Sequence, residues 1–271
     1  MTGTAPTDAL LTELLELATA AATAAGDLLH TGRPADLGVA ATKSSPVDIV
    51  TEMDLASEKL LQELIAERRP ADGYVGEEGT DRPGTSGVRW VVDPLDGTVN
   101  YLYGLPSWGV SVAAELDGEA VVGVVAVPAR GELFHAVRGR GARLDGHPVA
   151  VRPAPPWGRA LVSTGFNYVQ AVRTHQAEVL LALMPEVRDI RRGGAAAVDF
   201  CDLAAGRLDA FYERGLKPWD RAAGALIARE AGALVGGRPG RAEDGDLTVA
   251  GVPGVFEPLQ ERLEALGAWH D

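Results

Sequence analysis

The sequence predicts a mixed α/β fold made of two halves. In the first half, two amphipathic helices precede alternating apolar and polar segments separated by turn residues, which is typical of an antiparallel sheet. In the second half, strand-like and helix-like segments alternate, which favours a layered α/β arrangement. Pro153, Pro155 and Pro156 separate the two patterns. We therefore expect residues 1–152 and 153–271 to be two halves of one compact unit.

The first half begins with two helices. A helix is predicted over residues 8–30, because leucines and alanines recur there with a 3.6-residue period, and Thr7 or Asp8 can cap it. Residues 1–7 are expected to be frayed. The second helix is predicted over residues 52–69 on the same periodicity.

The remaining elements follow from shorter patterns. In the first half we expect a loop with one short strand over 31–45, strands at 74–76, 90–92, 108–116, 120–127, 132–137 and 149–151, and a surface loop over 80–87. In the second half we expect strands at 161–163, 187–190, 208–212 and 247–250, and helices at 171–184, 195–205, 219–231 and 255–266.

The composition narrows the class of protein. Hydrophobic residues make up 46% of the 271 residues, which is enough for a large core. The net charge of −13 argues against a nucleic-acid partner, which would need a basic face. The only cysteine, Cys201, excludes an internal disulfide and fits a reducing compartment. We see no targeting signal and no apolar run near the ~18 residues of a membrane span, so we expect a cytoplasmic protein without a membrane contact.

The candidate site is organised around the stretch Trp90-Val91-Val92-Asp93-Pro94-Leu95-Asp96-Gly97-Thr98-Val99-Asn100. The first three residues predict a buried strand, and Asp93 stands at its end, where α/β folds place ligand sites. Gly97 lets the backbone approach a ligand closely, and Thr98 offers a hydroxyl beside a helix N-terminus. A simple turn would not need Asp93 in addition to Asp96. The stretch therefore predicts cations on the carboxylates and an anion on the backbone amides.

Further carboxylates stand at the ends of other predicted elements, at Asp54, Glu77, Glu78 and Asp220. Taken alone, Asp54 is explained as a helix cap, the two glutamates as a solvated turn, and Asp220 as a first-turn acid. Taken together, they would repel at about 4 kcal/mol per pair at ~4 Å and an effective dielectric of ~20. Divalent ions would remove this cost, and an oxygen-only donor set suits Mg²⁺ or Mn²⁺ over zinc. Two such ions favour phosphate-ester hydrolysis by an activated water, which a Thr98 hydroxyl held by Asp54 would orient.

These segments resemble the inositol monophosphatase family. Its signature Trp-x-x-Asp-Pro-[Ile/Leu]-Asp-Gly-Thr is matched from Trp90 to Thr98, and a second signature from Lys217 to Gly232. Further matches are Lys43-Ser44-Ser45-Pro46-Val47-Asp48, Asp54, Gly76-Glu77-Glu78 and Gly194-Ala195-Ala196-Ala197. The resemblance extends over about residues 10–266 and is strongest to the bacterial members.

The resemblance implies a layered αβαβα sandwich of the inositol monophosphatase/fructose-1,6-bisphosphatase type, with most metal ligands in the first half. It implies a Mg²⁺-dependent phosphatase that releases myo-inositol and phosphate from myo-inositol monophosphate, is inhibited by lithium and forms a homodimer. Two to three Mg²⁺ ions are implied, with Mn²⁺ as a substitute. By resemblance, the first ion is held by Glu77, Asp93 and the carbonyl of Leu95, the second by Asp93, Asp96 and Asp220, and a third, weaker one by Glu77.

The same resemblance implies the remaining roles. Glu77 and Thr98 act on the attacking water, and Asp54 supports Thr98. The substrate is implied to contact Asp96, Gly97, Thr98, Gly194, Ala195, Ala196, Glu213 and Asp220. The chain departs from the family at Ala195, where many relatives carry a hydroxyl residue, and Lys217-Pro218 also varies. Both departures concern the alcohol half of the substrate.

Other positions have two interpretations. Trp157, Phe166, Tyr168 and Arg173 either shape the pocket rim or pack elsewhere, and packing is the commoner case. Arg191-Arg192 either steers an anionic substrate or is a solvated pair. Lys43 matches a family position near the metals but by itself is a surface lysine, and Cys201 is expected to be a small buried residue.

Three alternatives remain open at this point. The same chemistry could act on histidinol phosphate, fructose 1,6-bisphosphate, NADP or 3′-phosphoadenosine 5′-phosphate. The main cellular role could instead be partner binding in transcription or RNA processing. Finally, the metals could be structural, in which case Mg²⁺ would raise thermal stability without turnover.

Overall fold

The computed structural model describes residues 6–43 and 46–269, so the expectations for residues 1–5 and the match at Ser44-Ser45 lie outside the described residues. The described part contains seven α-helices and three sheets. The first helix begins as predicted, and Thr7, not Asp8, caps it by accepting a 3.3 Å hydrogen bond from the Leu10 N–H.

The first half forms an eight-stranded sheet in the order β10-β9-β8-β7-β6-β5-β3-β4. Its strands are β3 (Gly73–Gly76), β4 (Asp81–Arg82), β5 (Val88–Asp96), β6 (Gly109–Leu116), β7 (Glu119–Val127), β8 (Glu132–Val137), β9 (Ala142–Leu144) and β10 (His147–Val149). The helices of this half are α1 (Asp8–Gly32), α2 (Glu52–Arg68) and the short α3 (Thr98–Leu102). A separate two-stranded sheet pairs β1 (Ala41–Thr42) with β2 (Ile49–Val50).

The second half forms a five-stranded mixed sheet in the order β12-β11-β13-β15-β14. Its elements are β11 (Leu161–Thr164), α4 (Gln170–Leu183), β12 (Asp189–Arg191), α5 (Ala196–Ala204), β13 (Ala210–Glu213), α6 (Pro218–Glu230), β14 (Leu234–Gly236), β15 (Thr248–Gly251) and α7 (Phe256–Ala265). Single 3₁₀ turns lie at Pro128–Arg130, Trp157–Arg159 and Met184–Glu186.

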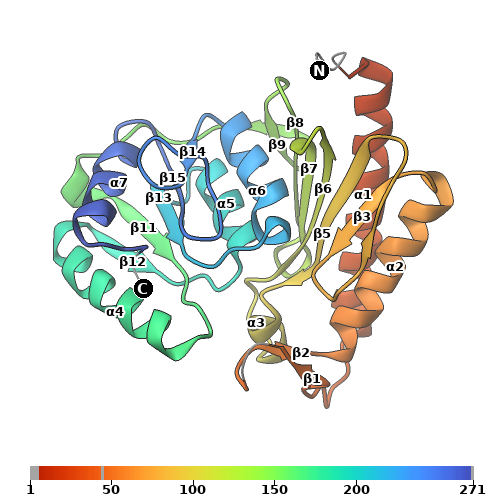
Figure 1. Cartoon of the computed structure of the whole chain (residues 1–271), viewed down its shortest axis with the longest axis horizontal. Helices are drawn as coiled ribbons and strands as arrows, with labels where there is room; N and C mark the ends of the chain where they lie inside the picture. Colours follow the sequence, from red (N-terminus) through yellow and green to blue (C-terminus); the bar gives the residue numbers. More distant parts are fainter. Residues whose placement is uncertain (1–5, 44–45, 270–271) are drawn as a thin grey trace.

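The layers follow the order αβαβα (Figure 1), as the resemblance implied. Helices α1 and α2 cover one face of the eight-stranded sheet, and α5 and α6 lie between that sheet and the five-stranded one. Helices α4 and α7 lie on the outside of the five-stranded sheet. Separate clusters of buried apolar side chains fill the spaces between these layers. The division at residues 152 and 153 stays a prediction.

The structure corrects several local predictions. The first sheet is not purely antiparallel, because β3 pairs parallel with β5. Strand β5 does not end at Asp93 but continues to Asp96, with an irregularity in its pairing with β6 between these two residues. The short strands β2, β4, β9 and β14 were not predicted, and β10 ends at Val149 where a strand over 149–151 was expected. These short strands were missed because two or three residues carry no clear alternation.

Helix α1 bears on the expectation that no apolar run is long enough to span a membrane. By length and composition alone it is apolar enough to cross a membrane. In the structure, its apolar face packs on β6, β7 and α2. Its buried side chains therefore form part of the core of the first half.

We expect Gly123→Ala to destabilise the fold, because β7 and α6 meet there without space for a side chain. A Cβ atom on Gly123 would lie 2.8 Å from the carbonyl oxygen and 3.0 Å from the Cα of Ala223. Since backbone atoms cannot yield as a flexible side chain can, the free energy of unfolding should fall by about 2 kcal/mol. Urea unfolding measures it, with Gly38→Ala, which has open space, as control. Equal unfolding midpoints for the two variants would contradict the prediction.

Candidate functional site

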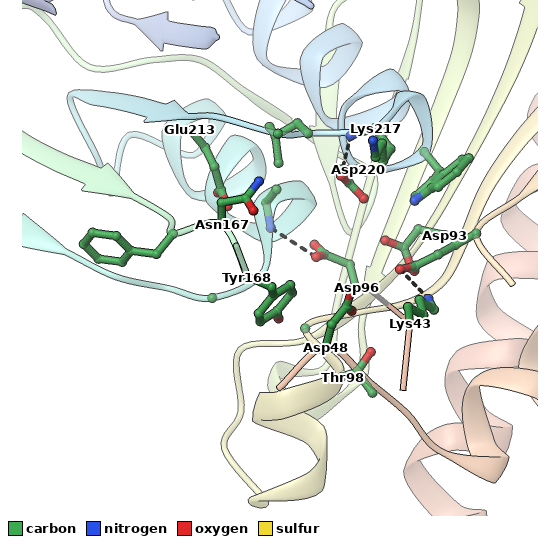
Figure 2. Close-up of a pocket in the computed structure, with 18 of the residues that line it drawn as sticks. Lys43, Asp48, Asp93, Asp96, Thr98, Asn167, Tyr168, Glu213, Lys217 and Asp220 are labelled. Carbon is green, nitrogen blue, oxygen red and sulfur yellow. Dashed lines mark hydrogen bonds and ion pairs between the residues drawn. The ribbon is translucent and has the colours of Figure 1, made fainter. Parts of the chain in front are cut away.

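The carboxylates predicted from separate segments open onto one cavity of about 450 Å³. Glu77 follows β3, Asp93 and Asp96 lie on the last part of β5, and Asp220 lies in the first turn of α6. Figure 2 shows Asp93, Asp96 and Asp220 pointing toward the same space. The cavity is also lined by the predicted residues Leu95, Gly97, Thr98, Gly194, Ala196 and Glu213. Two predicted residues do not line it: Asp54 and Ala195 are both buried behind its wall.

The Lys43 ammonium lies between two carboxylates at the cavity wall. Its Nζ atom is 2.7 Å from Glu77 Oε1 and 2.7 Å from Glu78 Oε1. Burial lowers the pKa of Lys43, but the two glutamates more than offset this, so its pKa is raised and it stays charged. Burial raises the pKa of Glu78 to about 7, and Lys43 opposes this shift. Lys43 is therefore part of the site, and it supplies positive charge where a metal cation is expected.

The other three carboxylates experience burial and mutual repulsion. Asp93 and Asp96 are buried, and Asp220 is half-buried. Removal from water raises the pKa of Asp93 and of Asp220 well above the usual range, and the neighbouring Glu77 raises both further. Burial raises the pKa of Asp96 to about 7, although backbone N–H groups at the start of α5 oppose this. Such a cluster favours cation binding because a divalent ion offsets the repulsion.

Each of these carboxylates is oriented by backbone amides. The N–H groups of Ala196 and Ala197 donate to the two oxygens of Asp96 at 3.1 and 2.7 Å. The Lys217 N–H donates to Asp220 Oδ2 at 2.6 Å. The Leu95 N–H donates to Asp93 Oδ1 at 3.0 Å. The N-termini of α5 and α6 thus fix Asp96 and Asp220, and the backbone of β5 fixes Asp93.

Asp54 joins the helix cap of α2 to the site. Its Oδ2 accepts hydrogen bonds from the Thr51 hydroxyl at 2.5 Å and from the Thr51 N–H at 2.8 Å. The Thr98 hydroxyl lies 2.9 Å from Asp54 Oδ1 and 3.1 Å from the Leu95 carbonyl oxygen, so its single hydrogen points toward these acceptors. One oxygen of Asp54 therefore caps the helix and the other holds the Thr98 hydroxyl. A lone pair of the Thr98 oxygen is left for a ligand in the cavity.

The backbone at Gly97 approaches the second half closely. Gly97 has φ of +88°, and a Cβ atom there would lie 3.0 Å from the Cβ of Ala195 and 3.0 Å from the Ser107 carbonyl oxygen. A side chain at this position would be both strained and crowded. The following helix α3 has only five residues, so attraction of an anion here depends on the N–H groups of its first turn, with little added by a helix dipole.

The wall opposite the acidic cluster is formed by residues at the ends of β11 and β13. Glu213 ends β13 there and is half-buried, which raises the pKa of its carboxyl well above the usual range, and the Arg192 guanidinium opposes this. Phe166 and Tyr168 line the cavity as rim residues, whereas Trp157 and Arg173 do not. Of the predicted arginine pair, only Arg192 lines it. Asn167 also lines this wall and was not predicted, because a single amide between two aromatic residues carries no signal in a sequence.

The donor set has the chemistry of a Mg²⁺ site but not yet its geometry. Within residues 6–43 and 46–269, no three His, Cys, Asp or Glu side chains are gathered closely enough to hold a metal ion. The contacts above explain this, since Lys43 engages Glu77 and backbone amides engage Asp96 and Asp220. All the candidate metal ligands in the cavity are oxygen atoms, and the acidic cluster carries an excess of negative charge. The residues therefore fit a hard divalent cation.

Comparison with known proteins gives consistent results. A sequence model of the inositol monophosphatase family matches residues 10–264. The chain is 44% identical over 238 residues to inositol-1-monophosphatase SuhB of Mycobacterium tuberculosis, covering 84% of this chain and 82% of that one. It is 39% identical over 224 residues to Nus factor SuhB of Escherichia coli, covering 82% and 84%. The fold matches the structure of Mycobacterium tuberculosis SuhB with a TM-score of 0.81 at 39% identity, covering 96% of this chain and 98% of that one.

Proposed function

Because the chain belongs to the inositol monophosphatase family, we propose that it is a Mg²⁺-dependent phosphomonoesterase that hydrolyses myo-inositol monophosphate to myo-inositol and phosphate. The observation that carries the proposal is the shared cavity, in which Glu77, Asp93 and Asp220 come together from distant parts of the sequence. The name of the Mycobacterium tuberculosis relative supports inositol monophosphate as the substrate.

In this proposal, the ligands that would hold two to three metal ions are Glu77, Asp93, Asp96, Asp220 and the Leu95 carbonyl oxygen. When bound, divalent ions supply positive charge to the phosphate oxygens and lower the pKa of a water molecule so that it can attack phosphorus. Mn²⁺ would serve as a substitute, and Li⁺ would inhibit by taking the place of one ion.

The protein's own groups position the reactants. Asp54 holds the Thr98 hydroxyl, whose free lone pair accepts a hydrogen bond from the attacking water. The carboxylate of Glu77 accepts a proton from that water. The N–H groups at Gly97 and Thr98 hold a phosphate oxygen, and Gly194, Ala196 and Glu213 contact the alcohol. Ala195, which the resemblance also implied, does not line the cavity.

A panel of phosphate esters tests the proposal. Phosphate release is measured for myo-inositol 1-phosphate, histidinol phosphate, fructose 1,6-bisphosphate, NADP and 3′-phosphoadenosine 5′-phosphate, each with Mg²⁺ and again with added LiCl. We expect the largest kcat/KM for myo-inositol 1-phosphate, and inhibition by lithium. Preference for another ester would correct the substrate, and background release from all of them in Mg²⁺ or Mn²⁺ would overturn the enzyme proposal in favour of a structural metal site.

We expect Thr98→Val to lower kcat about 10²-fold with little change in KM, because the isosteric side chain cannot orient the attacking water. Thr51→Val is a matched control, since it removes the hydroxyl that bonds to the other oxygen of the same Asp54. It should lower Tm through loss of the α2 cap and lower kcat much less. Equal losses of kcat in the two variants would contradict a role for Thr98 in the reaction.

A second candidate function is a partner-binding role in transcription. It is favoured by the 39% identity to the Escherichia coli protein named Nus factor SuhB. Survival of the cellular phenotype in a strain whose Asp93→Asn protein releases no phosphate would support it. We also place the protein in the cytoplasm, in line with its single, buried and unpaired Cys201. We expect a homodimer, with no membrane and no nucleic-acid partner.

A further inference from the structure

Two neighbouring strands bring an acceptor and a donor to the same part of the cavity. Strands β11 and β13 pair in parallel, so that Thr164 lies opposite Tyr212. Both chains then leave the sheet at its carboxyl edge, where α/β folds place ligand sites. Glu213 is the residue after Tyr212, and Asn167 stands three residues after Thr164, and both line the cavity.

The side chains of Glu213 and Asn167 each pack against the backbone of the segment that carries the other. A Cβ atom on Gly165 would lie 2.0 Å from the Glu213 carboxylate, so this carboxylate rests directly on Gly165. A Cβ atom on Gly215 would lie 2.3 Å from Asn167 Nδ2, so this amide rests on Gly215 in the same way. Figure 2 shows the two side chains next to each other on the wall opposite the acidic cluster. Glycine at both positions is therefore what allows the pair to form.

The hydrogen bonds around Asn167 fix which amide atom faces the cavity. The Val169 N–H lies 2.8 Å from the Asn167 side-chain oxygen, and an N–H can only be accepted by oxygen, so the amide orientation is determined. The backbone of Asn167 is also held, because its N–H donates to Gln176 Oε1 at 2.8 Å and its carbonyl accepts from Arg173 Nε at 2.9 Å. The hydrogen bonds of Asn167 to other described residues use its backbone and its side-chain oxygen, so the two Nδ2 hydrogens are left to donate to a ligand.

We propose that Asn167 is a specificity-determining residue that, together with Glu213, selects alcohols carrying two adjacent hydroxyl groups. One hydroxyl donates to a carboxylate oxygen of Glu213, and its neighbour accepts a hydrogen bond from Asn167 Nδ2. The inference rests on the proposed phosphatase function. In it, Asn167 recognises the alcohol that leaves and does not contact the phosphate. An ester whose alcohol lacks hydroxyl groups leaves both atoms unpaired and gains nothing from them.

The test compares two esters that present the same phosphate. Myo-inositol 1-phosphate carries adjacent hydroxyls, and 4-nitrophenyl phosphate carries none. In Asn167→Asp the oxygen that accepts from Val169 is kept, while the donor becomes an acceptor. We expect kcat/KM for myo-inositol 1-phosphate to fall about tenfold more than for 4-nitrophenyl phosphate, mainly through KM. Any general effect of the added charge acts on both esters and cancels in this ratio.

Two further variants make the result decisive. Asn167→Ala removes the amide without adding charge and should change the ratio of the two kcat/KM values about three- to tenfold in the same direction. Gln170→Glu adds a charge nearby at an exposed position that does not line the cavity, and should leave the ratio unchanged. Equal changes for both esters in the Asn167 variants would overturn the role of Asn167 while leaving the phosphatase proposal intact. If the unmodified protein hydrolyses neither ester, the proposed activity on myo-inositol monophosphate is overturned, and this inference with it.

Discussion

Asp93→Asn is expected to abolish phosphate release and, at the same time, to make the metal-free protein more stable. Asp93 is 2% exposed, and its carboxylate is repelled by Glu77, Asp96 and Asp220. In the proposed site it is the carboxylate shared by two metal ions, so its loss removes charge from both. We expect kcat/KM to fall at least about 10³-fold, because each ion contributes several kcal/mol of transition-state stabilisation.

The gain in stability follows from the same repulsion. An amide at position 93 has nearly the shape of the carboxyl group and does not ionise. At pH 7.5 the raised pKa of Asp93 costs the folded state free energy relative to the unfolded state, and the amide removes this cost. In EDTA at about pH 7.5, Tm should rise by about 3 °C or more, whereas with Mg²⁺ the unmodified protein should be the more stable of the two. A residue whose role is only structural would not lose activity and gain metal-free stability together.

Asp199→Asn is the matched control for this change. Asp199 is also a buried aspartate, 4% exposed, and burial raises its pKa to about 8, while the Ser163 hydroxyl donates to its Oδ1 at 2.9 Å. It faces a second cavity of about 370 Å³ and does not line the first one. Because Asp199 is largely uncharged near neutral pH, an amide should keep kcat/KM within about threefold. Full activity of Asp93→Asn, or equal losses in both variants, would contradict the shared metal site.

The acidic cluster could be predicted from the sequence because each of its members stands at the end of a predicted element. Asp93 follows the predicted buried strand and Asp220 opens a helix, and both positions are visible in local patterns. What local patterns could not show is that β5 continues through Pro94 to Asp96, because pairing with β6 extends the strand beyond its apolar residues. The parallel pairing of β3 with β5, which brings Glu77 beside Asp93, is likewise a long-range property.

The opposite wall could not be predicted in the same way. Asn167 faces Glu213 only because β11 and β13 are neighbours and because Gly165 and Gly215 leave room. Each glycine is two residues away from the side chain on its own strand, and nothing in either segment reveals the partner across the sheet. Lys43 was ambiguous for a related reason, since its two glutamate partners lie more than thirty residues later in the sequence.

The Tm of the metal-free protein is expected to fall as the pH rises from about 5 to about 8, and Mg²⁺ is expected to remove most of this fall. In the folded protein, burial raises the pKa of Asp96 and of Glu78 to about 7, and those of Asp93 and Asp220 are raised as well. Between the ordinary carboxyl pKa and these raised values, the folded state binds more protons than the unfolded state. Stability is therefore present at low pH and is lost as the pH rises.

The expected fall in Tm is about 5 °C or more between about pH 5 and about pH 8, measured by calorimetry in EDTA. One group works in the opposite direction, because burial lowers the pKa of His135, so the folded state gains stability as the pH rises through the ordinary histidine range. Asp199 adds to the fall at the upper end of the range, since burial raises its pKa to about 8. The carboxyl groups outnumber His135, so the net slope should be negative.

Addition of Mg²⁺ distinguishes the contribution of the acidic cluster to the pH dependence of Tm from that of other titrating groups. A cation that binds ionised Asp93, Asp96 and Asp220 competes with the protons on them, so the Tm gained from Mg²⁺ should be small near pH 5 and several degrees larger near pH 8. NaCl at matched ionic strength should not reproduce this gain, because screening acts weakly on buried charges. In Asp93→Asn both the pH-dependent fall and the Mg²⁺-induced gain should shrink together, since one carboxyl group contributes to both. A pH-independent gain, or an unchanged gain in Asp93→Asn, would place the metal outside this cavity.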